Sequence, residues 1–184
     1  MGEPAAASDV SRSDAPDSPR EAAATAERVG VGRAAWAVAG VALLFADAIY
    51  RLGLRAVETV AAGLSAGAWL ALVLLSAVFL YGEGYRALQL RFAPSVIQRA
   101  FNIDPQRSLH VLLAPLVVLS LLGAPARELL RGWLALVLIV GAALSVSALP
   151  SPWRGIIDGA VALALSWGLV ALLVQFRRAL RAPS

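Results

Sequence analysis

The sequence predicts an all-α fold: a polytopic transmembrane helix bundle of four to five apolar helices after a disordered N-terminal tail. Of the 184 residues, 59% are hydrophobic and 15% are charged, whereas a typical soluble domain is about 45–50% apolar and about 25% charged. The apolar residues are gathered into long blocks, and arginines stand mostly at the margins of these blocks. A soluble fold of this size could not bury so much apolar surface, so we expect lipid to surround the blocks.

Residues 1–33 are predicted to form the tail. The segment Met1–Glu27 is made mostly of Ala, Ser, Asp, Glu, Pro and Arg without apolar periodicity, a composition typical of disorder. The polar region before the first apolar run is too long and too acidic for the n-region of a good signal peptide. Ala46–Ala48 nevertheless has the form of a cleavage site after an apolar run, so processing there stays open.

Five apolar blocks follow and are predicted to form the membrane bundle over residues 34–181. The blocks are residues 34–49, 64–81, 109–123, 132–149 and 156–176. A spanning helix needs about 20 apolar residues, within a range of about 17–25. The second, fourth and fifth blocks meet this length, and the third meets it if it extends to Leu130. The first is short and contains Asp47.

Polar segments separate the blocks. The segment Pro150–Pro152 ends the fourth block, and Ser151 is predicted to cap the fifth helix. The longest break, residues 91–108, contains Ser95–Phe101, whose apolar side chains share one helical face. That spacing predicts a short helix lying in the head-group layer.

The arginines predict an orientation. All 16 basic residues are Arg. If all five blocks cross with the N-terminus inside, nine Arg lie inside and seven outside. If the first block does not cross, eleven lie inside and five outside, which fits the positive-inside rule better. We therefore favour four crossings, an interfacial or half-inserted first block, and a multi-pass protein of the bacterial inner (cytoplasmic) membrane with its C-terminus in the cytoplasm. Five crossings remain an open alternative.

The residue inventory excludes several chemistries. The chain has no Cys and one His, His110, which excludes thiol catalysis, iron–sulfur ligation and a multi-His zinc site within one chain. No basic stripe on a soluble face is present, so a nucleic-acid partner is not expected. We predict no catalytic, cofactor-binding or metal-binding residue and no cofactor, and an enzyme is disfavoured.

Polar residues within or beside the blocks form the candidate partner site. They are Glu83, Tyr85, Arg86, Arg154, Asp158, Asp47 and Arg51. Asp47, Arg51, Arg55 and Glu58 are spaced to share one face of a helix. This strip could contact an ion, a lipid head group or a partner, or it could consist of intrahelical pairs with snorkelling arginines.

Two further pairs can be read from spacing. Glu83 is flanked by glycines at the edge of an apolar block, where an ionisable group is costly unless it is paired. It could bind a partner, or pair with Arg86 three residues later. Arg154 and Asp158 are four residues apart at the predicted start of the fifth helix, where a local ion pair is the simplest interpretation.

Four glycines are predicted to allow close helix packing. Gly63 and Gly67, and Gly155 and Gly159, are separated by four positions, which lets neighbouring helices approach. The segment Gly63–Gly67 also matches the G-x-S-x-G pattern of hydrolases. Its flanks read as helix rather than as strand and helix, so we dismiss a nucleophile elbow.

Two sequence blocks carry a resemblance. One is Glu83-Gly84-Tyr85-Arg86 followed by Gln89, and the other is Leu149-Pro150 followed by Pro152–Asp158. With the block spacing, they make residues 34–176 similar to an uncharacterised family of small bacterial polytopic inner-membrane proteins. The resemblance implies a membrane location and no assigned activity.

These observations favour a non-enzymatic accessory or scaffold subunit that acts through helix–helix contacts. Its expected partners are the lipid bilayer and either other membrane proteins or a second copy of the chain. The alternative is a small oligomeric transporter or channel, or a lipid-binding membrane protein, that uses Glu83, Arg86 and Asp158. Convergence of these side chains would favour the alternative, and dispersion would favour the scaffold.

Overall fold

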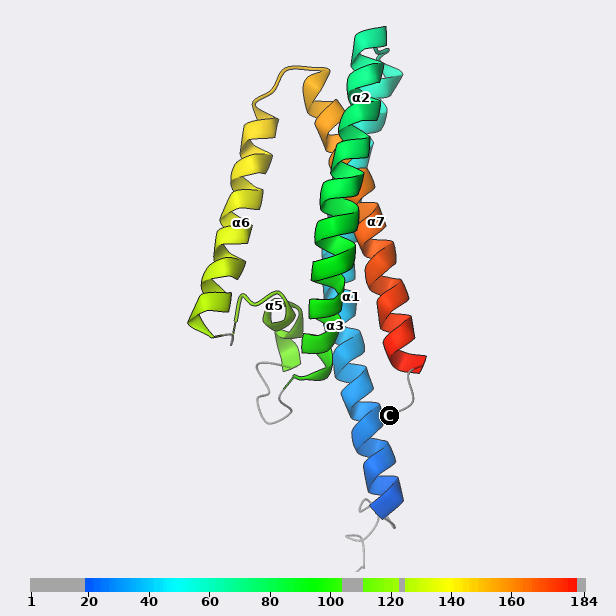
Figure 1. The fold of residues 1–184 in the computed structure, drawn as a ribbon, viewed down its shortest axis with the longest axis vertical. Coiled ribbons are helices and arrows are strands. Elements are labelled where there is room, and N and C mark those ends of the chain that lie inside the picture. The colour runs from blue at the N-terminus through cyan, green and yellow to red at the C-terminus, as the bar shows by residue number, and fades with distance from the viewer. Residues whose placement is uncertain (1–18, 104–110, 123–124, 182–184) are drawn as a thin grey trace, which may run out of the picture.

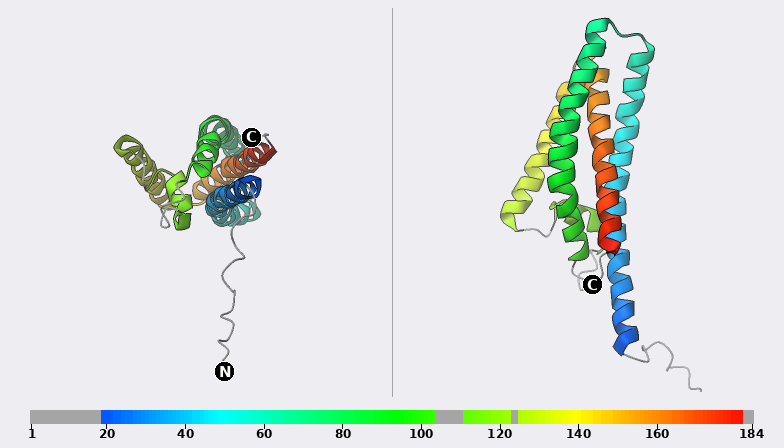
Figure 2. Two further views of the ribbon diagram at one scale, coloured as in Figure 1. Left: turned by 90° about the horizontal axis from the view of Figure 1, so that it is seen from below. Right: turned by 45° about the vertical axis from the view of Figure 1, so that its right-hand side comes forward.

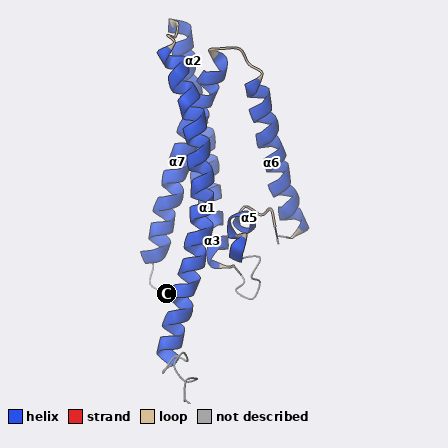
Figure 3. Cartoon of the chain, turned by 180° about the vertical axis from the view of Figure 1, so that it is seen from behind, coloured by secondary structure: helices blue, strands red, loops and turns tan. Residues whose placement is uncertain are grey.

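A computed structural model describes residues 19–103, 111–122 and 125–181, and within these ranges every regular element is a helix (Figure 3). The elements are α1 (Pro19–Ala61), α2 (Ala66–Phe79), the π-helix η1 (Leu80–Phe92), α3 (Ala93–Phe101), α5 (Ala114–Val118), α6 (Ala126–Ser147) and α7 (Trp153–Arg181). The predicted all-α fold class is confirmed.

Four helical segments are long and apolar enough to cross a membrane. They are Glu27–Ala61, Ala66–Phe101, Ala126–Ser147 and Trp153–Arg181. The second runs without interruption through α2, η1 and α3. Many of the large apolar side chains on these segments are exposed on the outside of the molecule, as expected of helices that face lipid.

Three of the segments form a bundle and the fourth stands beside it (Figures 1 and 2). Helix α7 packs against α1 on one side and against α2 and η1 on the other. Helix α6 has no buried residue and contacts the rest of the molecule at both ends: near α7 at one and through Gly132, which faces the backbone of Ser120, at the other. Both described ends of the chain, the start of α1 and the end of α7, lie at the same end of the bundle (Figure 1).

The main apolar core lies toward the end that holds the described chain ends. Its buried members include Ala37, Val38 and Val41 of α1, Val96 and Ile97 of α3, Ala114 and Val118 of α5, and Leu172 of α7. Phe45 stacks on Phe92, with ring centroids 5.6 Å apart. Four elements, α1, α3, α5 and α7, therefore contribute to one core.

The third apolar block is not among the candidate spans found in the described residues, contrary to our prediction. Within the described part of this block, α5 is a helix of five residues, Ala114–Val118, and Ser120 has a positive φ of 59° that turns the chain. A Cβ at Gly40 of α1 would overlap the ring of Pro115. Because Gly40 has no side chain, the ring of Pro115 fits against α1. The apolar residues Ala114 and Val118 of α5 are then buried in the core.

The first block, by contrast, belongs to a candidate span, Glu27–Ala61. The candidate spans therefore differ from the arrangement that we favoured, with the third block crossing and the first lying at the interface, although the number four is retained. The reason is that the helix does not end at Asp47 but continues to Ala61, which gives it the length that the apolar block alone lacks.

Helix α1 also begins earlier than expected. It starts at Pro19, inside the segment 1–33 that we predicted to be a disordered tail. Proline suits the first position of a helix because its missing N–H would have no partner there. The Ala-rich sequence that follows has high helix propensity. The first 18 residues of the predicted tail lie outside the described residues.

The turn between α1 and α2 corrects two further expectations. Gly63 lies outside both helices with φ of 89°, and Ser65 caps α2 by accepting a hydrogen bond from the amide of Ala68 at 3.3 Å. A Cβ at Gly63 or Gly67 would meet nothing within 4 Å. Gly63 serves the chain reversal and Gly67 lies in the first turn of α2, and neither makes the helix packing that we predicted with another described part of the chain.

The predicted head-group helix at Ser95–Phe101 is instead the end of the second long segment. Helix α3 follows η1 directly, and Val96, Ile97 and Ala100 are buried in the core. The shared apolar face was read correctly, but it packs against α1, α5 and α7. Pro94 does not break the helix because prolines are tolerated in its first turn.

Candidate functional site

The candidate site is built around Asp158, on the second turn of α7. Among the described residues, Asp158 and Ser120 are the buried polar side chains, and the side chain of Asp158 is only 7% exposed. Helix α7 positions it against α1 because Gly155 and Gly159 face Thr59 and Ala56. A Cβ at Gly155 would overlap Thr59, so the missing side chain lets the two helices approach closely.

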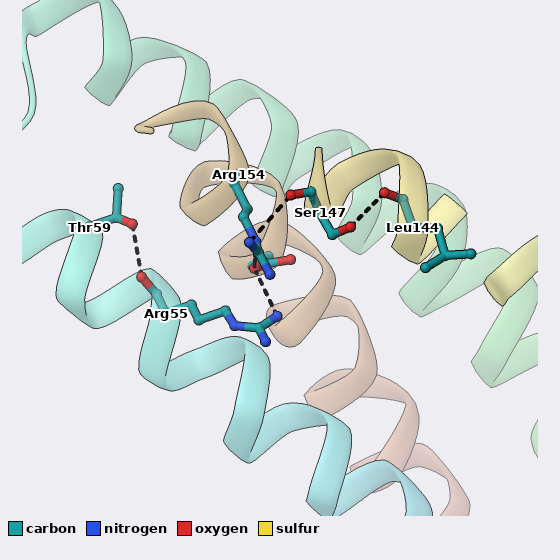
Figure 4. A network of polar contacts seen from close by, with 6 residues as sticks. Arg55, Thr59, Leu144, Ser147 and Arg154 are labelled. Carbon is teal, nitrogen blue, oxygen red and sulfur yellow. Dashed lines mark hydrogen bonds and ion pairs between the residues drawn. The ribbon is translucent and has the colours of Figure 1, made fainter. Parts of the chain in front are cut away.

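Two guanidinium groups lie beside the carboxylate (Figure 4). Nη1 of Arg55, on α1, is 3.8 Å from Oδ2 of Asp158. Nε of Arg154, one turn before Asp158 on α7, is 4.0 Å from the same oxygen. The carboxylate thus joins α1 to the start of α7, and its two basic neighbours leave the group with an excess positive charge.

Neighbouring polar groups extend this link to α6. Nη1 of Arg154 donates a hydrogen bond to the carbonyl oxygen of Ser147, at the end of α6, at 3.3 Å (Figure 4). The hydroxyl of Thr59 donates to the carbonyl oxygen of Arg55 at 2.9 Å. The site therefore ties together three candidate spans at the end of the bundle opposite the described chain ends.

The buried charges are paired but not hydrogen-bonded to each other. Oδ2 of Asp158 and Nε of Arg154 have no hydrogen-bond partner among the described residues, and separations of 3.8 and 4.0 Å exceed hydrogen-bond length. No group of three or more His, Cys, Asp or Glu side chains gathers anywhere in the described part of the chain. One carboxylate between two arginines can hold helices together or meet an anion, but it lacks a nucleophile–base pair.

The remaining candidates lie elsewhere. Nε of Arg51 is 3.0 Å from Oδ1 of Asp47 on the exposed side of α1, within one helix. Tyr85 stacks on Tyr81 with ring centroids 6.1 Å apart. Glu83 and Arg86 are exposed on η1, and no ion pair joins them within the described residues. The seven candidates thus fall into three separate groups, not one site.

Two ion-pair contacts of the structure were not predicted from the sequence. Arg55 was seen as a member of a surface strip, but it turns away from that strip to meet Asp158. Arg99 of α3 lies 3.0 Å from Glu128 of α6 and donates to the carbonyl oxygen of Val118 at 3.3 Å. The ion pairs Arg55–Asp158 and Arg99–Glu128 join residues far apart in sequence, so local spacing could not predict them.

The comparison with known proteins adds no function. No family model, no curated protein and no solved structure matches the chain.

Proposed function

We propose that this chain is a multi-pass protein of the inner (cytoplasmic) membrane that acts as a non-enzymatic accessory or scaffold subunit through helix–helix contacts. The observation that carries the proposal is the division of the polar residues. In the set around Asp158 the carboxylate is buried between α1 and α7, with the partly exposed Arg55 and Arg154 beside it, whereas Glu83 and Arg86 are exposed on the side of η1. The first set holds the fold, and the second is free to meet another molecule.

The set of Asp158, Arg55 and Arg154 has the features of a contact that holds helices together. Asp158 sits where Gly155 and Gly159 bring α7 close to α1, and Arg154 reaches the end of α6. Buried ionisable groups within spanning helices usually pair with one another or with backbone carbonyls. Each charged member of this group does so, which accounts for the cluster without a substrate.

The transport alternative requires Glu83, Arg86 and Asp158 to converge. Asp158 lies at the end of the bundle beside Thr59 and Arg55. Gly84, between Glu83 and Arg86, packs instead against Ala164 and Trp167, further along α7. The dispersion of these residues favours the scaffold over a polar route through one copy.

The arginines support an orientation with both ends of the described chain in the cytoplasm. Ten described arginines lie in the half of the molecule that holds these ends: Arg20, Arg28, Arg33, Arg91, Arg99, Arg127, Arg131, Arg177, Arg178 and Arg181. Arg55 and Arg154 lie in the opposite half, with Arg51 and Arg86 between. This imbalance follows the positive-inside rule.

The test is purification of the full chain from its native membrane in mild detergent with its lipids, followed by mass spectrometry. A scaffold should retain protein partners in fixed ratio, and Glu83→Gln with Arg86→Gln should release them while Asp158→Asn retains them. Ion or solute flux through reconstituted vesicles that is abolished by Asp158→Asn would contradict the proposal.

A further inference from the structure

The exposed side of η1 carries charge halfway along a candidate span. Glu83 and Gly84 are the 18th and 19th of the 36 residues of Ala66–Phe101. A Cβ at Gly84 would lie 3.4 Å from the carbonyl oxygen of Ala164 and 3.4 Å from Cβ of Trp167. Those two residues flank the middle of the apolar run of α7, residues 156–176. Glu83 and Arg86 therefore lie near the middle of the bundle, away from both ends.

Glu83 and Arg86 form no ion pair with any described residue of the chain. A comparable acid and base on α1, Asp47 and Arg51, form an ion pair of 3.0 Å. Glu83 and Arg86 are both exposed, and in the described part of the chain neither is within ion-pair distance of an opposite charge. Ionisable side chains at this depth almost always face protein or a wet cavity rather than lipid. Another protein surface is thus expected over this face.

Two neighbours make the face suitable for a protein contact. The rings of Tyr81 and Tyr85 stack on each other while remaining 63% and 40% exposed, and rigid aromatic rings are enriched in protein interfaces. A Cβ at Gly82 would meet nothing within 4 Å, so the backbone there is open to close approach by a second helix. The face combines rings, an opening and two charges.

The charges are arranged to complement themselves. An acid and a base three positions apart differ in depth by about 4.5 Å at 1.5 Å per residue, or less in a π-helix. Rotation of a second copy by half a turn about the membrane normal keeps both depths and brings each acid toward the other copy's base. A two-fold interface requires this reciprocity, in which residue i meets j and j meets i.

We propose that two copies of this chain pair through the exposed face of η1, with Glu83 of each copy beside Arg86 of the other. The inference rests on the proposed function, since it names the partner of the same contact surface. Gly82 lies at the close approach of the two helices, and the stacked rings of Tyr81 and Tyr85 flank it.

A charge-exchange experiment tests the reciprocal pairing. Donor- and acceptor-labelled copies of the full chain are co-expressed, and energy transfer is measured in native membrane vesicles. Glu83→Arg alone and Arg86→Glu alone should each reduce the transfer to the level of a non-interacting membrane protein. One single variant mixed with the other should restore it, because one copy then carries two positive and the other two negative side chains. Pairing within a single chain cannot produce that rescue.

A steric pair of variants gives an independent check. Gly82→Leu should abolish the transfer because it fills the open space on η1. Gly141→Leu, on α6, is the matched control, since a Cβ there also meets nothing within 4 Å, and it should leave the transfer unchanged. Wild-type energy transfer that none of these variants alters, or no transfer at all, would overturn the pairing.

A photo-crosslinker in place of Tyr81 separates the pairing from the broader function. An adduct of two copies supports both proposals. Adducts with a different membrane protein and none between copies overturn the pairing and keep the contact-based function. Adducts with lipid alone overturn both.

Discussion

Asp158 acts through the groups that surround it. Its side chain is only 7% exposed, whereas the side chains of its partners Arg55 and Arg154 are 50% and 36% exposed. Pairs with exposed partners contribute little by Coulomb attraction alone. When the carboxylate is removed, Arg55 and Arg154 remain side by side at the α1–α7 contact as like charges without a counter-charge.

We predict that Asp158→Ala lowers the free energy of unfolding by about 1–3 kcal/mol, because it leaves Arg154 beside Arg55 without a counter-charge. The measurement is unfolding of the purified full chain in mixed micelles. Glu58→Gln, on the exposed side of α1, is the control and should change it by about 0.5 kcal/mol or less. An equal loss of unfolding free energy for both variants would show that Asp158 does not hold α1 and α7 together.

The pair can also be tested for direct coupling. In a double-mutant cycle of Arg55→Ala and Asp158→Ala, we expect a coupling free energy of about 0.5–1 kcal/mol, since Arg55 is half exposed. The same unfolding measurement supplies it. Strict additivity of the two single losses would show that Arg55 is only a neighbour of the carboxylate.

At the scale of elements, the contact between α1 and α7 depends on missing side chains. Gly155 faces Thr59, and Cβ at Gly159 would lie 3.1 Å from Cβ of Ala56. In lipid, helices associate through such close packing because apolar burial from water no longer drives them together. The prediction of packing at Gly155 and Gly159 therefore agrees with the geometry.

We predict that Gly155→Leu destabilises the chain by about 1–3 kcal/mol, the usual range for overpacking a tight contact. The space is already occupied by the Thr59 side chain. Gly141→Leu should be neutral in the same thermal unfolding assay in detergent, because its surroundings are open. An unchanged midpoint for Gly155→Leu would contradict the close contact.

Local sequence predicted some elements well and others poorly, for physical reasons. The lengths of the apolar blocks located α6 and α7, which begin directly after Pro125 and Pro152. It failed for α5, where Gly40 and Pro115 are 75 positions apart and their fit appears only in the folded core. The same limit applies to the site: Arg154–Asp158 is a local spacing, whereas Arg55–Asp158 depends on how α1 lies on α7.

At the scale of the whole molecule, the four candidate spans define an order of crossings. Helix α1 leads away from the end that holds the described chain ends, α2 to α3 return, α6 leads away again and α7 returns (Figure 1). The segment around α5 then stays at the end where it packs against α1 and α3. Exchanging the first and third blocks as spans would reverse the side of every position between them.

The most direct test of this arrangement is cysteine accessibility in intact cells, which the absence of native Cys makes straightforward. Single variants Ala62→Cys, Asn102→Cys and Leu149→Cys are treated with a membrane-impermeant thiol reagent. We predict labelling from outside at positions 62 and 149 and protection at 102 until the membrane is opened. Labelling at 102 with protection at 62 would contradict it and show that the third block crosses the membrane instead of the first.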